Sequence, residues 1–369
     1  DEPERFRSLD PLPRGVELWH RDRLDEAQRL LAGIPGVTVL IYDQRCAAES
    51  RRLRKRGALP VRPMRVVINE AVCEGCGDCG AASNCLSVQP VETEFGRKTR
   101  IDQTSCNTDY SCLKGDCPSF VTVEAPAKAP RRRAERPEPP AVPDVEPPAS
   151  GEVFLAGIGG TGVVTVNQVL GSAAIRDGRA VHGLDQTGLS QKAGPVTSHL
   201  RIAPDEAGLG PANRVGTATA YLAFDVLVGA DGKNLARADA ATTTAVVSTS
   251  PVPTGAMVSD VRAPAPDVEA LVARIGEQAA RVVRIDAQAA AQALFGDAMP
   301  ANFLVVGAAY QAGVLPLSAE AIEFAIELNG VAVAANIAAF RWGRVAVADP
   351  QAFAAATARP AAAPSRTWD

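Results

Sequence analysis

The sequence predicts an α/β protein in which a large domain of alternating strands and helices follows a small, cysteine-rich α+β module. Three observations lead to this prediction. An apolar strand at 152–156 is followed by a glycine-rich turn and an apolar helix, the pattern of a strand–turn–helix unit. Seven of the eight cysteines lie between Cys73 and Cys117. A proline-rich stretch at 126–150 separates the two regions.

Length and composition restrict the class of protein. At roughly 150 residues per domain, 369 residues favour two or three domains, and 46% hydrophobic residues permit a sizeable core. With 38 basic and 42 acidic side chains the net charge is −4, which argues against a nucleic-acid-binding protein. No apolar run approaches the roughly 18 residues of a membrane span. We expect a cytoplasmic protein without nucleic-acid or membrane partners.

The first 60 residues read as the end of an α/β domain. A strand is predicted at 16–20, a helix follows, and the β-branched and apolar run 37–42 is typical of a buried parallel strand. A single strand–helix–strand unit cannot bury both faces of its sheet. The chain also starts at Asp1 without an initiator Met. We therefore expect it to be a piece of a longer protein.

Cys73, Cys76 and Cys79 form a C-x-x-C-x-x-C run, which lets three thiolates converge on one face of a [4Fe–4S] cube. The glycines within this run permit the positive φ angles that such a loop needs. Zinc would favour four ligands in two C-x-x-C pairs. Eight cysteines could also form disulfides, but no signal peptide indicates an oxidising compartment.

The remaining cysteines suggest a fourth ligand and a second centre. Cys117, followed by proline, matches the distant fourth ligand of two-cluster ferredoxins, so the first cluster is predicted to use it. Cys85, Cys106 and Cys112 then remain. Three thiolates suit a [3Fe–4S] centre, or a cube completed by a non-cysteine ligand. The candidates for that ligand are Asp109 and Asp116, and Cys46 is interpreted as a buried structural thiol.

The flanking segments complete a ferredoxin-like module over 61–125. Strands at 87–93 and 98–101 around a turn with Gly96 predict a β-hairpin between the two groups of cysteines. The natural chemistry of such a module is one-electron transfer. The eight prolines of 126–150 indicate an extended linker, and 349–369 is expected to be a flexible tail.

The second domain, at 151–348, is predicted to be a Rossmann-like doubly wound sheet. Gly157, Gly159 and Gly162 fit G-x-G-x-x-G between strand and helix, where free N–H groups favour an anion. Asp185 lies 23 residues beyond Gly162 and is a candidate ribose ligand. The open alternatives are close strand–helix packing alone, a phosphate or CoA-type site, and a dinucleotide site. The further elements are strands at 179–183, 196–202, 245–250 and 281–285 and helices from 267, near 287–294, 301–312 and 318–328.

The loop between Gly183 and Pro195 is unusually dense in hydrogen-bonding side chains, among them Gln186 and Lys192. Long ordered loops on α/β sheets are often functional. The strand that follows carries His199, which we interpret as a satisfied, partly buried residue rather than a catalyst. No triad or pair of carboxylates is recognised, so no catalytic residue is assigned.

Taken together, CEGCGDC, SNCLSV, TEFGRK, YSC…CPSFV and GIGGTGVVTVNQVL…GLDQTGLSQK…GP resemble the long fused form of indolepyruvate ferredoxin oxidoreductase, in the 2-oxoacid:ferredoxin oxidoreductase family. The resemblance covers about 15–348. It implies that 1–60 ends a thiamine-diphosphate domain, that 61–125 is an inserted ferredoxin and that 151–348 is the γ-type domain. No thiamine-binding motif is found, so that cofactor would act on another part of the enzyme.

The resemblance also implies an activity. The family decarboxylates an aryl 2-oxoacid on thiamine diphosphate, passes electrons singly through Fe–S clusters to ferredoxin, and releases an acyl-CoA. Ferredoxin and the remainder of the enzyme are the implied partners, and we expect a homo-oligomer. The alternatives are a non-catalytic Fe–S electron-transfer subunit and an NAD(P)- or FAD-linked Fe–S reductase. The residues expected to position CoA phosphates or close the neighbouring site are Gly157, Gly159, Gly160, Thr161, Gly162, Gln186 and Lys192.

Overall fold

The structure is a computed structural model that describes residues 6, 13–43, 45–83, 85–103, 105–124, 137–188, 194–210, 216–260 and 262–358. The chain divides into two compact units, Asp1–Arg62 and Pro63–Asp369. No helix among the described residues is long and apolar enough to cross a membrane.

The described part of the N-terminal unit contains helices and no strand. The strands predicted at 16–20 and 37–42 are therefore wrong for this chain. Val37 is 95% exposed and Ile41 is 85% exposed. A strand needs a neighbouring strand to satisfy its backbone hydrogen bonds, and none is described within this unit. The elements are η1 Arg21–Arg23, α2 Leu24–Ala32 and α3 Ala47–Lys55.

The cysteine module, at 63–124, is built on two antiparallel strand pairs. Its first and last strands pair, with Met64 opposite Glu124 and Ile68 opposite Phe120. The predicted hairpin is confirmed, and Gly96 follows its two-residue turn with a φ of +86°. The elements are β1 Met64–Ile68, α4 Asp78–Ser83, β2 Val88–Thr93, β3 Gly96–Ile101, η2 Ser111–Lys114 and β4 Phe120–Glu124.

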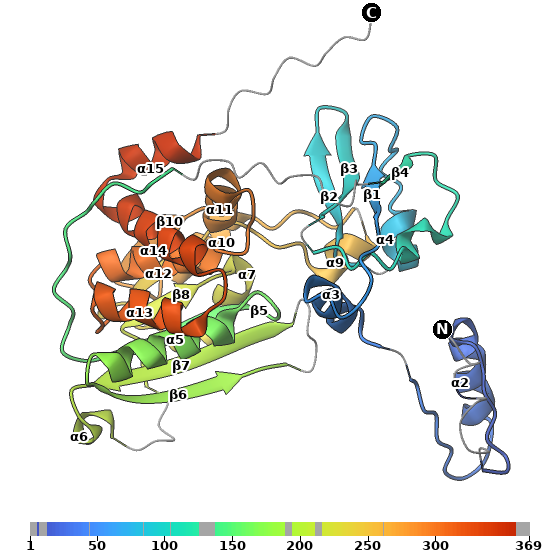
Figure 1. Cartoon of the computed structure of the whole chain (residues 1–369), viewed down its shortest axis with the longest axis horizontal. Coiled ribbons are helices and arrows are strands. Elements are labelled where there is room, and N and C mark those ends of the chain that lie inside the picture. Colours follow the sequence, from blue (N-terminus) through green and yellow to red (C-terminus); the bar gives the residue numbers. More distant parts are fainter. Residues whose placement is uncertain are drawn as a thin grey trace, which may run out of the picture. The chain divides into compact units, whose positions relative to one another are not determined.

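The sheet domain, from residue 151 onward, contains a six-stranded sheet in the order β10-β9-β8-β5-β7-β6 (Figure 1). Strands β5, β8, β9 and β10 are parallel, whereas β7 runs antiparallel to both of its neighbours. The strands are β5 Gly151–Ile158, β6 Ala180–Gln186, β7 Pro195–Ala203, β8 Ala220–Ala223, β9 Thr244–Ser248 and β10 Arg281–Ile285. The α/β fold class is confirmed.

Helices cover both faces of this sheet. Val153 and Leu155 of β5 point into one core, with α5, α12, α13 and α14, while Phe154 and Ala156 point into the other, with α7 and α10. This alternation follows from the two-residue repeat of a strand. The helices are α5 Val163–Arg176, α6 Glu206–Leu209, α7 Val226–Gly229, α8 Gly232–Leu235, α9 Gly255–Ser259, α10 Val268–Gly276, α11 Ala287–Phe295, α12 Ala301–Gln311, α13 Ala319–Asn329, α14 Val333–Ala348 and α15 Pro350–Thr357.

Helices α12 and α14 cross at a reciprocal pair of glycines. A Cβ on Gly307 would overlap the Phe340 carbonyl oxygen, and a Cβ on Gly343 would overlap the Leu304 carbonyl oxygen. Only glycine permits two helix backbones to approach this closely. The crossing brings Gln311 of α12 and Arg344 of α14 together at the same surface.

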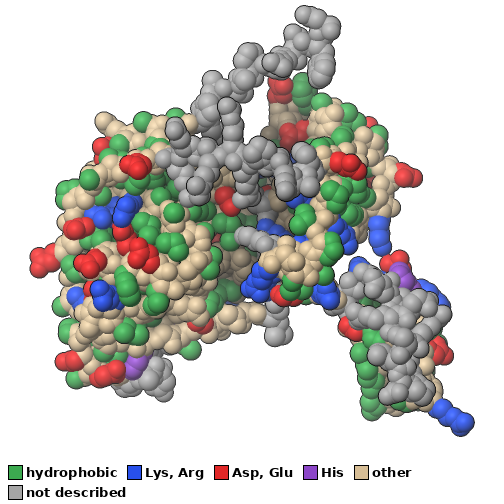
Figure 2. Space-filling view, viewed as in Figure 1, with side chains coloured by type: hydrophobic (Ala, Val, Ile, Leu, Met, Phe, Trp, Pro, Cys, Tyr) green, Lys and Arg blue, Asp and Glu red, His purple; other side chains and the backbone are tan. Residues whose placement is uncertain are grey.

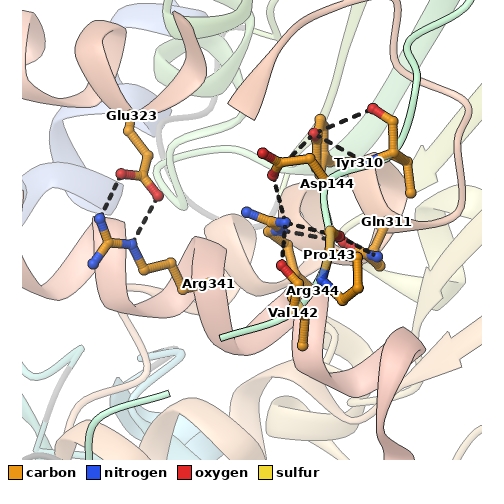
Figure 3. Close-up of polar contacts among 9 residues, drawn as sticks. Val142, Pro143, Asp144, Tyr310, Gln311, Glu323, Arg341 and Arg344 are labelled. Atoms are coloured by element: carbon orange, nitrogen blue, oxygen red, sulfur yellow. Dashed lines mark hydrogen bonds and ion pairs between the residues drawn. The ribbon is translucent and has the colours of Figure 1, made fainter. Parts of the chain in front are cut away.

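The second half of the predicted linker, from 137, is extended, and it lies on this surface. We call residues 137–149 the strap. Arg344 of α14 is buried and its Nη2 donates to Val142 O and Pro143 O, both at 3.1 Å, and to Asp144 Oδ1 at 2.7 Å (Figure 3). One guanidinium thus satisfies three oxygen atoms of the strap.

Neighbouring side chains add to this attachment. Gln311 Nε2 donates to Pro143 O at 3.0 Å, and its oxygen accepts from Arg344 Nε at 3.1 Å (Figure 3). Trp342 Nε1 donates to Pro137 O at 3.0 Å. Proline cannot donate a backbone hydrogen bond, so the strap presents mainly carbonyl acceptors, and the helices supply donors.

The prediction of a flexible tail from 349 is wrong for its first residues, which form helix α15. Asp349 caps α15, its carboxylate accepting from Ala352 N at 3.0 Å, and Pro350 occupies the first turn, where its missing N–H costs nothing. Phe353 packs on the main core. The remainder of the tail, from 359, lies outside the described residues.

The strap attachment predicts unequal effects for two arginines one turn apart on α14. Arg344→Ala should lower the free energy of unfolding by about 2–4 kcal/mol, because it leaves several acceptors of the strap without a donor. Arg341→Ala removes a solvent-exposed pair with Glu323 and should cost about 0–1 kcal/mol. Urea unfolding followed by circular dichroism measures both. Equal losses would contradict the assignment.

Candidate functional site

The first cysteine loop places Cys73, Cys76 and Cys79 around a sharply turning backbone. Gly75 and Gly77 have φ angles of +70° and +86°, as predicted for this loop. Gly75 N donates to Cys73 Sγ at 3.4 Å. The thiol of Cys73 is buried, Cys79 is half-buried and Cys76 is exposed.

The three sulfur atoms of this loop are electrostatic neighbours. Burial raises the pKa of the Cys79 thiol above its ordinary value, and the charges of Cys73 and Cys76 raise it further, against the lowering effect of the neighbouring Gly80 N–H and Thr99 hydroxyl. We call Cys73, Cys76 and Cys79 the first thiol trio.

Cys85, Cys106 and Cys112 form a second thiol trio, as the sequence grouped them. Burial raises the pKa of Cys112 to about 11, and the charges of Cys85 and Cys106 contribute in the same direction. Burial likewise raises the pKa of Cys106. At neutral pH the thiols of Cys106 and Cys112 are protonated when nothing is bound.

A strained loop supports the second trio. Thr108 and Tyr110 both adopt positive φ angles, 53° and 63°, which are uncommon for residues other than glycine. Thr108 N donates to Cys106 Sγ at 3.4 Å, and Tyr110 OH donates to Met64 O at 2.9 Å. The bond to β1 anchors this loop against the strand pair.

The remaining two cysteines, Cys117 and Cys46, belong to neither trio. Cys117 is exposed and its sulfur lies 3.0 Å from Ser119 Oγ. Cys46 is exposed in the N-terminal unit, so its interpretation as a buried structural thiol is wrong. Its apolar neighbours in sequence do not form a core within that unit.

Within the part of the chain that the structure describes, no three potential ligands converge closely enough to hold a metal ion. The chemistry of these residues nevertheless suits a group that is ligated by sulfur, because the available ligands are cysteine thiols. Both trios consist of free thiols, and all of them except the exposed Cys76 belong to the small core of the module or pack against it. Because thiolates are the ligating form, binding an iron–sulfur group would displace the protons that burial otherwise retains.

The glycine turn between β5 and α5 combines close packing with positive φ angles. A Cβ on Gly157 would lie 2.7 Å from Val163 Cγ2 and 3.2 Å from Phe224 Cβ. Gly160 and Gly162 have φ angles of +83° and +100°. The packing interpretation therefore accounts for Gly157, and turn geometry accounts for the other two glycines.

Two N–H groups of the turn are already used within the chain. Gly159 N donates to Gly194 O at 2.7 Å, and Thr161 N donates to Ile158 O at 3.3 Å. Asn302 of α12 closes the turn from the other side, donating to Thr161 O at 3.1 Å. The turn is held rigidly between β7 and α12.

Asp185 does not occupy the position of a ribose ligand. Its strand, β6, is separated from β5 by the antiparallel β7, whereas a dinucleotide fold places the acidic residue on the strand beside the first. Asp185 Oδ1 accepts from Asn167 Nδ2 at 3.0 Å and from Ser198 Oγ. Gln186 ends the same strand with an exposed side chain, and Lys192 lies outside the described residues.

A buried ionic group that the sequence did not predict lies at the other end of β5. His199 Nε2 is 3.3 Å from Glu152 Oε2, and Arg201 Nε is 3.6 Å from Glu152 Oε1. His199 and Arg201 are 6% and 5% exposed. Burial lowers the pKa of His199, with Arg201 and Arg237 acting in the same direction against Glu152. His199 is therefore buried, but the expectation of a satisfied histidine is wrong at Nε2, which has no hydrogen-bond partner among the described residues.

The alternation of side chains along a strand could have predicted part of this group from the sequence. His199 and Arg201 are two residues apart on β7, so they share a face, and strand pairing places Glu152 opposite Arg201. Sequence reasoning could place the first two together but not the third.

The surface carries no single-sign face in the view of Figure 2. Acidic and basic side chains are interspersed with apolar ones over the larger body of described residues. This distribution agrees with the small net charge of −4.

Fold and site together define an α/β sheet domain joined to a small thiol-rich module. Residues 152–346 match the model of the family described as pyruvate ferredoxin/flavodoxin oxidoreductase. Because the match spans more than half of the chain, the chain belongs to this family. The resemblance noted from the sequence is thereby confirmed at family level, and the cysteine module lies outside the matched residues. No curated protein matches the chain.

Three solved structures are similar to the sheet domain. Pyruvate oxidoreductase subunit PORC from Thermotoga maritima has 20% identity and a TM-score of 0.39, over 53% of this chain and 96% of that chain. The γ subunit of a keto/oxoacid ferredoxin oxidoreductase from Geobacter sulfurreducens has 20% identity and a TM-score of 0.37, over 53% and 97%. The 2-oxoglutarate:ferredoxin oxidoreductase from Magnetococcus marinus has 18% identity and a TM-score of 0.41, over 54% and 31%.

The close packing around Gly157 predicts that replacing it destabilises the fold, whereas replacing a nearby glycine does not. Gly157→Ala should lower the free energy of unfolding by about 1–3 kcal/mol, because the new methyl meets Val163 and Phe224. Gly171→Ala, in the interior of α5 with its nearest contact at 3.8 Å, should leave stability unchanged or raise it by up to about 1 kcal/mol. Thermal unfolding of the two variants tests this, and a harmless Gly157→Ala would refute it.

The lowered pKa of His199 predicts a pH-dependent stability. Below about pH 6.5 the unfolded chain binds a proton at this imidazole that the folded chain excludes, so stability falls as the pH drops through that value. His199→Gln should reduce this slope between pH 5 and 7. Chemical unfolding at several pH values measures the slope, with His20→Gln, at an exposed site, as the control. An unchanged slope in His199→Gln would contradict the assignment.

Proposed function

We propose that the chain is the electron-exit part of an indolepyruvate, or aryl 2-oxoacid, ferredoxin oxidoreductase. In this proposal the cysteine module carries one or two Fe–S clusters, and the sheet domain contributes one wall of the site where the acyl group is passed to CoA. The observation that carries the proposal is the pair of thiol trios in a module joined to a sheet domain of this oxidoreductase family. Family membership supports the reaction class, and the sequence motifs suggest the aryl substrate.

Each part of the chain has a role in this proposal. Residues 1–60 end a thiamine-diphosphate domain, 61–125 form the ferredoxin-like module, 126–150 join it to the γ-type domain at 151–348, and 349–369 form the C-terminal extension. Thiamine diphosphate would act on another part of the enzyme, and ferredoxin would accept the electrons. The exposed apolar run at 37–42 is consistent with a sheet completed elsewhere in the enzyme.

The first thiol trio is proposed to hold a [4Fe–4S] cluster together with Cys117. The cluster would supply one-electron transfer, which a two-electron hydride carrier cannot replace. The chain's own residues provide a buried sulfur at Cys73 and a half-buried one at Cys79, with backbone N–H groups beside both. The second trio is proposed to hold a further centre, completed by Asp109 or Asp116 if it is a cube.

The glycine turn is proposed to lie near the CoA phosphates. Gly160 and Gly162, which adopt positive φ angles, place no Cβ at the N-terminus of α5, a helix of 14 residues. The hydrogen bonds of Gly159 and Thr161 within the turn hold that backbone in place. Gln186 and Lys192 belong to the same proposal.

The metal proposal has a direct test. Chain purified without oxygen should contain about four iron and four acid-labile sulfide atoms per cluster, and reduction with dithionite should give an electron paramagnetic resonance signal. Cys76→Ser should lose most of the first cluster's iron, whereas Cys46→Ser, which alters the exposed thiol outside the module, should retain it. Zinc in place of iron, or no metal after reconstitution with iron and sulfide, would overturn the proposal.

A non-catalytic electron-transfer subunit is the second candidate, and the same thiol trios support it. The two proposals differ in whether sequence with a thiamine-binding motif belongs to the same reading frame as this chain. Addition of indolepyruvate, thiamine diphosphate, CoA and methyl viologen to the iron-loaded chain should give no reduction of the dye in either case. Dye reduction should appear in the first case only when sequence that carries a thiamine-binding motif is joined in the same reading frame.

A further inference from the structure

Helix α9 leaves the sheet domain and packs on the cysteine module. It lies in the connection between β9 and α10, and it contacts both α4 and β2 (Figure 1). Val258 of α9 is 2% exposed although it belongs to neither core of the sheet domain. Val258 is also absent from the small core of the module, but it lies against Gly80 of α4.

The closest approach is between two backbones. A Cβ on Gly80 would overlap the carbonyl oxygen of Val258, and that position lies 3.8 Å from Val258 Cγ1. Gly80 is buried and directly follows Cys79, a member of the first thiol trio. The absence of a side chain at Gly80 is what allows α9 to reach the cysteine loop.

Arg97 makes a second attachment from the hairpin. Its Nη1 donates to Ala263 O at 2.5 Å, four residues beyond α9, and its Nε donates to Glu92 Oε1 at 2.6 Å. The carbonyl oxygen of Arg97 also packs against Gly75 in the first cysteine loop, where a Cβ would overlap it. One residue thus touches the cysteine loop through its backbone and the sheet domain through its side chain.

We propose that α9 and Ala263 form a docking surface for the first cysteine loop, called here the α9 clamp. The loop is held between the β2–β3 hairpin and the sheet domain, and the clamp covers the side of the loop that carries Gly80. Gly80 and Arg97 act as positioning residues. That the clamped loop carries a cluster rests on the proposed function, whereas the docking itself does not.

Two consequences follow from such a clamp. Exclusion of water from one side of the loop would change the dielectric surroundings of any group bound by the first trio, which is one determinant of a cluster's reduction potential. The clamp would also hold this trio at a fixed distance from the sheet domain.

The test compares two glycines of the same module in the full chain. Gly80→Ala should force α9 off the loop and raise amide hydrogen exchange in peptides spanning 251–260 by about tenfold or more. Gly115→Ala, where a Cβ meets nothing within 4 Å, should leave that exchange unchanged. Unaltered exchange in Gly80→Ala would overturn the proposal.

A second pair of variants covers the case in which Gly80→Ala fails to fold. Arg97→Ala adds no atoms and removes the bond to Ala263, so it should raise exchange in the same peptides. Arg100→Ala, an exposed arginine on the same strand, is its control. Normal protection in Arg97→Ala would likewise refute the clamp.

A redox measurement separates this inference from the proposed function. In the iron-loaded chain, Arg97→Ala should shift the midpoint potential of the first cluster while its iron content stays at the wild-type value. If the wild type binds no iron, the proposed function fails and the exchange data still decide whether the clamp exists. If iron binds and neither exchange nor potential responds to Arg97→Ala, the clamp is refuted and the proposed function stands.

Discussion

The burial of the parallel strands on both faces is the constraint on which the sheet domain depends. Every residue of β8 is buried, and β5 is buried along nearly its whole length. Such strands are stable only where a helix covers each face, because the sheet has no polar side to offer to water. The chain meets this requirement with two cores of unequal size.

The larger core sets the geometry of the surface outside it. The reciprocal contact of Gly307 and Gly343 lets α12 and α14 cross at backbone distance, which aligns Gln311 with Arg344. Those side chains then bind the strap. The final part of the linker therefore belongs to the sheet domain, although its composition is that of an extended segment without a core of its own.

The cysteine module, unlike the sheet domain, has few apolar side chains with which to build a core. Its core contains Val66, Ile68, Val88 and Ile101 together with Cys73, and other thiols border it. The residues that would ligate a cluster are therefore also part of the packing. Burial raises the pKa of Cys79, Cys106 and Cys112, so these three thiols keep their protons in the absence of a ligand.

Sequence patterns predicted the structure correctly where the residues that determine it all lie in one short segment. The glycines of the first cysteine loop, the hairpin at Gly96 and the strand–turn–helix at Gly157 were all predicted, because turn chemistry and periodicity depend on near neighbours in the chain. The strand at 37–42 failed because a strand's partner is distant. The prediction of Asp185 as a ribose ligand failed for the same reason, since the order of strands in the sheet decides which residues lie beside it.

The sequence by itself determined the class of each region: an alternating α/β domain, a cysteine module with two groups of thiols, and a proline-rich connection. Only the tertiary structure decided which segments meet. It placed β7 between β5 and β6, put Glu152 beside His199, seated the strap on Arg344 and brought α9 against Gly80. The physical reason is that these contacts join residues far apart in the chain, and they depend on backbone approach and strand order rather than on local propensity.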